Sequence, residues 1–295
     1  MKITTKILIS GLSALALGTT ALSQSANDDL LQNSRSFSKL NDQNFDDRNY
    51  SIPSLGDDHT QVHMKMKGYV FGFRIIRTDY IAKFNQNEYV AYADAKTSGL
   101  AAILKKMEIW AVTKGRFNRN GLRPDWHVQQ NTDKKNRRVE MNYDRQTAKV
   151  DVAIVPPLGS QGIPPATPRE RYSANDTLSG IMDIMMTSRQ LDGELCTGRV
   201  PIFDSKQHYN LRLERVGTKR VKFHEGKSET IHCRAYYETV SGYDPEDLPS
   251  EEEAAAPINI YVKYYPEADL HIPVRLTYKI SGFKAVIKMD ELDIR

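Results

Sequence analysis

The chain has 295 residues, of which 41 are basic and 37 acidic, so its formal charge at neutral pH is only +4. Charges this evenly balanced give no strong positive field, and we therefore expect no nucleic-acid partner. A hydrophobic share of 40% can supply a large core, and 15 Tyr with dispersed Gly and Pro favour many strands joined by turns over a helical bundle.

Residues 1–23 have the three parts of a secretory signal peptide. Lys2 and Lys6 make the start positive, residues 7–22 are apolar and uncharged, and Ala21 and Ser23 are small residues suited to cleavage. The alternative is a membrane anchor, but the apolar run is shorter than the roughly 20 residues that span a bilayer. We expect cleavage, at a site that the sequence leaves open, and localisation in the periplasm of a Gram-negative envelope. Loss of residues 1–23 removes two Lys, which leaves 39 basic and 37 acidic residues and a charge of +2.

Residues 24–61 are dominated by Asn, Asp, Ser and Gln, and they hold too few apolar side chains to offset chain entropy. We expect a disordered polar arm there, followed by a β-rich domain over residues 62–291. No later apolar run is long enough to span a bilayer, so the mature chain is expected to have no transmembrane segment.

The first half of this domain alternates apolar and polar residues and is rich in β-branched and aromatic side chains, as strands are. Gly68 and Gly72 are expected at a bulge or a close backbone approach. Residues 98–104 are ambiguous between helix and strand, and residues 121–124 are expected to form a turn. The strands expected in this half cover residues 69–80, 88–94, 107–113, 126–130, 138–143 and 147–155.

A Pro-rich loop is expected at residues 156–168, and a helix at residues 175–190. Asp176 lies in the first turn of this helix, where the helix dipole favours a negative charge. More strands follow, interrupted by an acidic loop at residues 241–257. These strands are expected at residues 198–203, 208–216, 220–224, 230–240, 258–265, 273–280 and 283–289.

Short turns between consecutive strands favour antiparallel pairing. The expected fold class is mainly β, with a single large antiparallel curled sheet (a β-spiral or open barrel) wrapped around one central α-helix. The alternative is two strand-rich domains separated by the Pro-rich loop.

Cys196 and Cys233 are the two Cys of the chain, and in an oxidising compartment they are expected to form a structural disulfide. Their separation does not fit a redox pair of the C-x-x-C type. Two free buried thiols are the alternative. His232 beside Cys233 could activate a thiolate, but neighbouring residues of a strand point to opposite faces.

Met182, Met185 and Met186 form a stripe on the expected helix. Methionine adapts to irregular apolar surfaces, so the stripe is a candidate lining for a lipid-binding cavity. An ordinary core helix is the alternative. Asp176 and Asp183 share one face of this helix, and we expect one to cap it and the other to contact Arg at the surface.

A dense basic cluster lies between two expected strands. It is a candidate contact for lipopolysaccharide or another anionic envelope polymer, and the alternative is the solvated tip of a hairpin. Its residues are Lys134, Lys135, Arg137 and Arg138.

Motifs that carry chemistry are missing from the sequence, which has no nucleophile elbow, phosphate-cradling loop or H-E-x-x-H. His59 and His63 stand four residues apart near Asp57 and Asp58, but a polar segment makes this a weak metal site. We assign no catalytic residue, no metal and no cofactor.

Several short motifs occur in an order that resembles an exported bacterial family, domain of unknown function 3108. The resemblance covers roughly residues 62–291 and implies a periplasmic β-rich domain, and it carries no catalytic residues over. The chain is also distantly similar to alphaproteobacterial periplasmic envelope-integrity proteins, in which a β-spiral surrounds a helix and one disulfide is present. The motifs include Gly72-Phe73, Ser98-Gly-Leu, Gly121-Leu-x-Pro124, Asp176-Thr-Leu-Ser-Gly180, Cys233 and Ile272-Pro-Val-Arg275.

Arg275, in the last of these motifs, is expected either to pair with the helix acids or to bind an anionic head group in a cavity. Our leading hypothesis is a non-enzymatic periplasmic envelope protein that binds a lipid, a lipoprotein or an envelope protein. One alternative is a glycan- or peptidoglycan-binding module that uses Trp110 and Trp126, and another is an unrecognised hydrolase. The sequence does not indicate the ligand or the oligomeric state.

Overall fold

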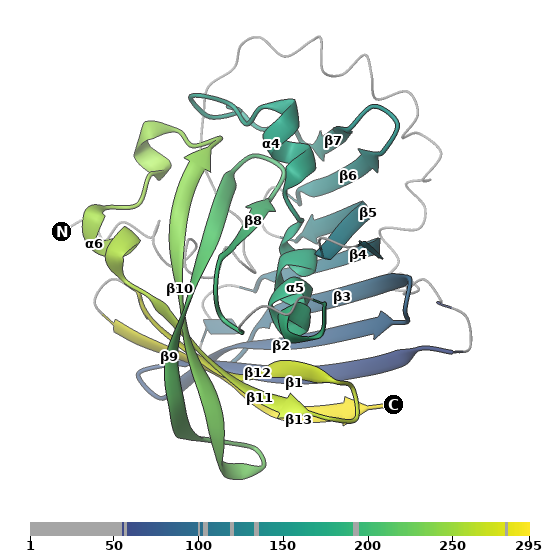
Figure 1. The fold of residues 1–295 in the computed structure, drawn as a ribbon. Coiled ribbons are helices and arrows are strands. Elements are labelled where there is room, and N and C mark those ends of the chain that lie inside the picture. Colours follow the sequence, from purple (N-terminus) through teal and green to yellow (C-terminus); the bar gives the residue numbers. More distant parts are fainter. Residues whose placement is uncertain are drawn as a thin grey trace, which may run out of the picture.

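The computed structural model describes residues 55, 58–99, 101–102, 106–118, 121–132, 136–190, 195–280 and 283–295. Thirteen strands within these residues form one antiparallel sheet that curls around a helix (Figure 1), so the expected fold class is confirmed. The expected signal peptide and most of the expected polar arm lie outside the described residues.

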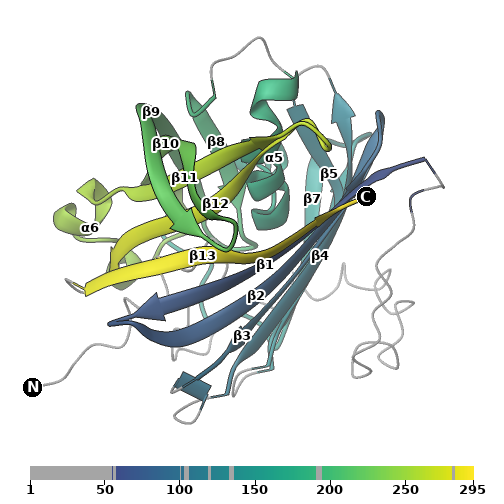
Figure 2. The same cartoon turned by 90° about the horizontal axis from the view of Figure 1, so that it is seen from below.

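The sheet consists of two meanders that meet at the first and last strands. The first meander is β1 (Thr60–Val70), β2 (Phe73–Phe84), β3 (Glu88–Thr97), β4 (Glu108–Asn118), β5 (Gly121–Asn131), β6 (Arg138–Asp144) and β7 (Lys149–Val155). The second is β8 (Arg199–Phe203), β9 (His208–Phe223), β10 (Gly226–Ser241), β11 (Ile258–Tyr265), β12 (Leu270–Ile280) and β13 (Phe283–Ile294). Because β1 pairs with β13, these two strands lie in the middle of the sheet, and β7 and β8 are its edges (Figure 2).

The segment between the two edges folds into helices α4 (Pro168–Ser173) and α5 (Thr177–Gln190). Thr167 and Glu170 cap α4 reciprocally, and this short helix was not expected. Between the helices, the backbone N–H of Asn175 donates to Pro201, and Asn175 accepts from Phe203, at 2.9 and 2.8 Å. This segment therefore covers the free edge of β8, which would otherwise present unpaired backbone groups.

Helix α5 lies inside the curl and contacts β3, β4, β5, β8 and β12. Four of its buried side chains, Leu178, Met182, Met185 and Met186, belong to the main hydrophobic core. Full burial of one such side chain stabilises the fold by about 1.5–3 kcal/mol, so this stripe holds the helix against the inner face of the sheet.

Some expected element boundaries were wrong. Residues 69–80 contain the end of β1, a turn at Phe71 and Gly72, and the start of β2, whereas residues 121–124 belong to strand β5. Residues 208–224 form one strand, β9, apart from the last residue. Gly68 does lie at a bulge, as expected, because the pairing register shifts after it.

The expected acidic loop at residues 241–257 contains the 3-10 helix η3 (Pro245–Asp247) and helix α6 (Glu251–Ala255). Cys196 and Cys233, whose Cα atoms are 5.7 Å apart, bring their sulfur atoms to disulfide distance as expected. Both are buried in a second cluster with residues of β9, β10 and β11. The pair therefore ties the chain before β8 to β10.

Candidate functional site

The turn between β1 and β2 exposes aromatic side chains. Val70 pairs with Phe73, which leaves Phe71 and Gly72 as a two-residue turn with φ of 52° and 81°. Positive φ at both central positions fits the twist of a hairpin, but a bulky residue rarely adopts it. Phe71 is nevertheless 69% exposed and Phe73 57% exposed. Strain and exposure at the same residue favour a role beyond folding.

Phe283 extends this aromatic tip from the neighbouring turn. It begins β13, is 49% exposed, and its ring centroid lies 4.6 Å from that of Phe71. The ends of the β1–β2 and β12–β13 hairpins thus lie side by side, as both ribbon views show (Figures 1 and 2). We call Phe71, Phe73 and Phe283 the aromatic tip.

A cavity of about 720 Å³ opens beside the aromatic tip. On β13, the core residues Ala285, Ile287 and Met289 alternate with the lining residues Lys284, Val286 and Lys288, so these three point to the outer face of the sheet. We call it the cationic pocket. It is lined by Tyr69, Phe71, Gly72, Lys222, Arg275, Phe283, Lys284, Val286 and Lys288.

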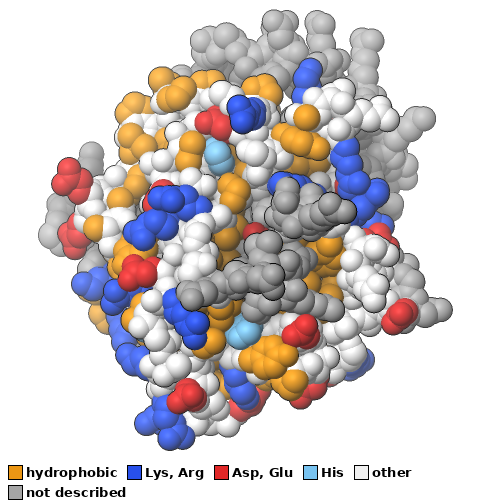
Figure 3. Space-filling view, viewed as in Figure 1, with side chains coloured by type: hydrophobic (Ala, Val, Ile, Leu, Met, Phe, Trp, Pro, Cys, Tyr) orange, Lys and Arg blue, Asp and Glu red, His pale blue; other side chains and the backbone are white. Residues whose placement is uncertain are grey.

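Contacts within the cationic pocket join three parts of the chain. Arg275 on β12 donates to the backbone oxygen of Lys222 at 3.3 Å, which brings the β9–β10 hairpin to the pocket. The ammonium of Lys288 lies 4.9 Å from the ring centroid of Tyr69. Figure 3 shows Lys and Arg side chains gathered with hydrophobic ones at the lower left, where Figure 1 places the two hairpin ends.

No acidic side chain lines the cationic pocket. Within the described residues, no ion pair forms to Lys222, Arg275, Lys284 or Lys288. Four unpaired cations around one cavity repel one another and attract anions. Aromatic rings beside such cations suit a ligand that is apolar on one side and anionic on the other.

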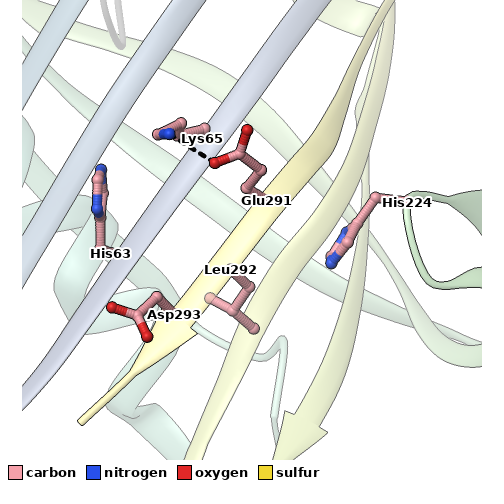
Figure 4. A pocket seen from close by; sticks show the side chains of 6 residues that line it. All are labelled: His63, Lys65, His224, Glu291, Leu292 and Asp293. Atoms are coloured by element: carbon pink, nitrogen blue, oxygen red, sulfur yellow. Dashed lines mark hydrogen bonds and ion pairs between the residues drawn. The ribbon is translucent and has the colours of Figure 1, made fainter.

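A second, smaller cavity of about 270 Å³ lies further along β1 and β13 (Figure 4). Its charges are mixed, because Lys65 donates to Glu291 at 2.5 Å and Asp293 also faces it. His63 lies 3.1 Å from Asp79, and His224 comes from the turn between β9 and β10. Among the described residues, no group of three or more His, Cys, Asp or Glu side chains is placed to bind a metal ion.

A buried polar cluster anchors the start of α5. Asp176 Oδ1 accepts from the backbone of Leu178 and Ser179 at 2.9 and 3.0 Å and from Thr113 Oγ1 at 2.7 Å, and it lies 3.1 Å from His127 Nδ1. Burial by itself would raise the pKa of Asp176, but His127 and the hydrogen bonds from Ser179 outweigh it and hold the pKa below its usual range.

Asp176 caps the helix as expected, but it is fully buried. Asp183, expected at the surface, is half-buried near Arg123. Burial, the largest influence, raises the pKa of Asp183 to about 6, although Arg123 and the Leu122 backbone oppose the shift. Neither of the two cavities described above is lined by residues of the cluster around Asp176.

The comparisons with known proteins place the chain in a family. The family model described as "Protein of unknown function (DUF3108)" matches residues 61–282. The chain belongs to this family. The expected resemblance is thereby confirmed, and no curated protein matches the DUF3108 chain.

Solved structures similar to the DUF3108 chain have low sequence identity. A β-barrel-like DUF1849 protein from Brucella abortus is 13% identical, with a TM-score of 0.45, over 80% of this chain and 97% of that one. A provisionally named lipoprotein from Parabacteroides distasonis is 13% identical, with a TM-score of 0.30, over 80% and 96%. A provisionally named exported protein with a YmcC-like fold from Bacteroides fragilis is 11% identical, with a TM-score of 0.31, over 79% and 95%.

Arg275 is the one expected site residue that the structure places in the cationic pocket. Its expected pairing with the helix acids was wrong, because it alternates with Val274 and Leu276, which face the core around α5. Met182, Met185 and Met186 line neither cavity and are buried in that core. Their proposed contact with a ligand stays a prediction.

The remaining candidates are spread over the molecule. Lys134 and Lys135 lie outside the described residues, whereas Arg137 donates to the Pro156 backbone at 3.1 Å and Arg138 pairs with Glu140 at 2.7 Å. Part of this basic cluster is thus engaged within the protein.

The side chains proposed for glycan binding or thiol activation have protein partners. Trp110 and Trp126 are half-buried and pack against a cluster that contains Leu55. His232 lies 2.8 Å from Asn259 and stacks on Tyr261, while its neighbour Cys233 faces Cys196.

Sequence reasoning missed most of the cationic pocket. Tyr69, Phe71 and Phe283 appeared only as strand residues, and the lysines of β13 were not singled out. One signal was present: Lys284 and Lys288 stand an even number of positions apart, which places both on one face of a strand. Among the described residues, no helix has both the length and the apolarity to cross a bilayer.

Proposed function

We propose that this DUF3108 protein is a non-enzymatic, exported cell-envelope protein that binds anionic lipid at a membrane surface through the cationic pocket. One observation carries the proposal: four cations that form no ion pair within the described residues surround a cavity that is also lined by the exposed Phe71 and Phe283. Cations favour anionic headgroups, and exposed aromatic rings favour the interface between headgroups and acyl chains.

The shape of the site supports a lipid rather than a soluble anion. A soluble anion would contact only the cations. It would therefore not account for the positive φ of the exposed Phe71 or for the contact between Phe71 and Phe283. A lipid uses both halves of the site. Its phosphate lies among the pocket cations while the aromatic tip enters the bilayer interface.

Vesicle flotation tests the proposal. The full mature protein is mixed with vesicles of phosphatidylcholine alone or with phosphatidylglycerol added. Binding should require the anionic lipid and weaken as salt increases. Each Lys near an anionic surface contributes about 1 kcal/mol, so the double variant Lys284→Gln/Lys288→Gln should bind roughly 30-fold more weakly.

The matched control is Lys106→Gln/Lys149→Gln. It removes two exposed lysines that do not line the pocket, with the same change in net charge. It should bind like the unchanged protein. Equal weakening of both double variants would show that only net charge matters, and absence of binding to anionic vesicles would refute the proposal.

A further inference from the structure

Cations lie in register across neighbouring strands on the outer face. Arg77 on β2 opposes Lys67 on β1, Lys67 opposes Lys288 on β13, and Lys288 opposes Arg275 on β12. Neighbouring strands are about 4.8 Å apart, so four strands place these residues along a row of roughly 14 Å. Like charges directly opposite each other destabilise a sheet.

A second like-charge pair lies two register steps along β12 and β13. Lys279 opposes Lys284, with Thr277 and Val286 paired between the two charged pairs. The intervening pair puts Arg275 and Lys279 on one face of β12, and Lys284 and Lys288 on the same face of β13. Arg275, Lys284 and Lys288 of these two pairs line the cationic pocket, and Lys279 stands beside it, opposite Lys284.

Acidic side chains balance only part of the positive charge in this arrangement. Lys67 pairs with Asp290 at 2.6 Å, and further along the same strands Lys65 faces Glu291 in register. Within the described residues no ion pair forms to Lys279, Lys284, Lys288 or Arg275. The sheet therefore carries more positive charge here than one monovalent anion can balance.

From these pairs we infer that the cationic pocket selects lipid headgroups carrying two or more negative charges, such as a phosphomonoester, over headgroups with a single charge. The inference rests on the proposed function. A phosphodiester headgroup such as phosphatidylglycerol carries one negative charge. A phosphomonoester carries nearly two at pH 7.5, because its second pKa is about 6.

Charge-matched vesicles test the inference. One set contains phosphatidic acid, and the other contains enough phosphatidylglycerol to give the same measured zeta potential, so that the two surface charges agree. At pH 7.5 the unchanged protein should bind the phosphatidic acid vesicles about tenfold more tightly, which corresponds to roughly 1.4 kcal/mol. Equal affinity for the two sets would overturn the inference and leave the proposed function standing. Failure to bind either set would remove both.

The variant Arg275→Gln/Lys279→Gln removes one cation from each like-charge pair. It should lose the preference for phosphatidic acid while it keeps part of its affinity for phosphatidylglycerol vesicles. Its thermal stability should stay the same or rise, because like-charge pairs are relieved. The control Lys106→Gln/Lys149→Gln should keep the preference, and an equal loss in that control would overturn the inference.

Competition separates recognition of phosphate from general screening. Inorganic phosphate should displace the protein from phosphatidic acid vesicles more strongly than sodium chloride of equal ionic strength. Equal displacement by the two salts would overturn the inference, because ionic strength alone would then account for binding.

Discussion

The buried cluster around Asp176 and the cationic pocket both contain charged side chains, but the charge is hydrogen-bonded inside the protein in the first and faces solvent in the second. Asp176 is buried and accepts hydrogen bonds from Leu178, Ser179 and Thr113 beside His127. The pocket cations face solvent and repel one another. A charge that is satisfied inside the protein holds the fold together, whereas unsatisfied charge on the surface is available to a ligand. Changes in the two regions should therefore separate stability from binding.

The largest effect is expected from Asp176→Ala. It leaves the backbone N–H groups of Leu178 and Ser179 and the hydroxyl of Thr113 without their acceptor. Each buried donor left unsatisfied costs about 1–3 kcal/mol, so a total loss of about 3–5 kcal/mol is expected. Chemical denaturation followed by circular dichroism measures this change. Vesicle affinity of the folded fraction should not change, and a loss of stability below about 1 kcal/mol would contradict the assignment of this cluster as the anchor of α5.

The next effect concerns Cys196 and Cys233. A bridge across a sequence separation of 37 constrains the unfolded chain, so Cys196→Ala/Cys233→Ala should lose about 2–4 kcal/mol of stability. Denaturation with and without a reducing agent measures it, and the double variant should not respond to the reductant. Vesicle binding should be retained, since both residues belong to the core cluster away from the pocket.

A smaller, pH-dependent effect is expected at Asp183, whose pKa in the folded state is about 6 against an ordinary value of 3.8. The folded protein therefore holds this proton to higher pH, and stability should fall as the pH rises from about 4 to 6, by on the order of 2 kcal/mol.

Asp183→Asn should remove this fall, matching the unchanged protein at pH 4 and exceeding its stability at pH 7.5. Denaturation at a series of pH values measures it. Asp151→Asn, on the edge strand β7, removes the same charge as a control and should leave the pH profile unchanged. A profile that is the same in all three proteins would contradict the assignment.

The smallest change in stability is expected at Phe71, where the two readouts should move in opposite directions. Phe71→Gly relieves a positive φ and should stabilise the fold by about 1 kcal/mol. It also removes an exposed ring from the aromatic tip, so affinity for anionic vesicles should fall roughly tenfold. Ala148→Gly, at another turn with φ of 52°, should give the same gain without loss of binding. Equal binding by both variants would exclude Phe71 from the membrane contact.

Local sequence patterns determined much of the architecture. Alternation indicated most strands, because a half-buried strand must place apolar residues at every second position. The spacing of Leu178, Met182 and Met185 predicted α5, since residues three and four apart share a helix face. The ordered motifs predicted the family, and the two Cys were expected to pair. Glycines were less informative, because Gly72 forms a hairpin turn while Gly121 begins a strand.

The tertiary structure alone decided which charged residues lie together. The pairing of β1 with β13 joins residues more than 200 positions apart, and no local pattern encodes that register. It places Lys67 opposite Lys288, while the β12–β13 pairing adds Arg275 and the β9–β10 hairpin adds Lys222. The sequence by itself thus determined the elements, since their side-chain periodicity is local. The cationic pocket exists only because long-range strand pairing and the curl of the sheet bring three distant segments to one surface.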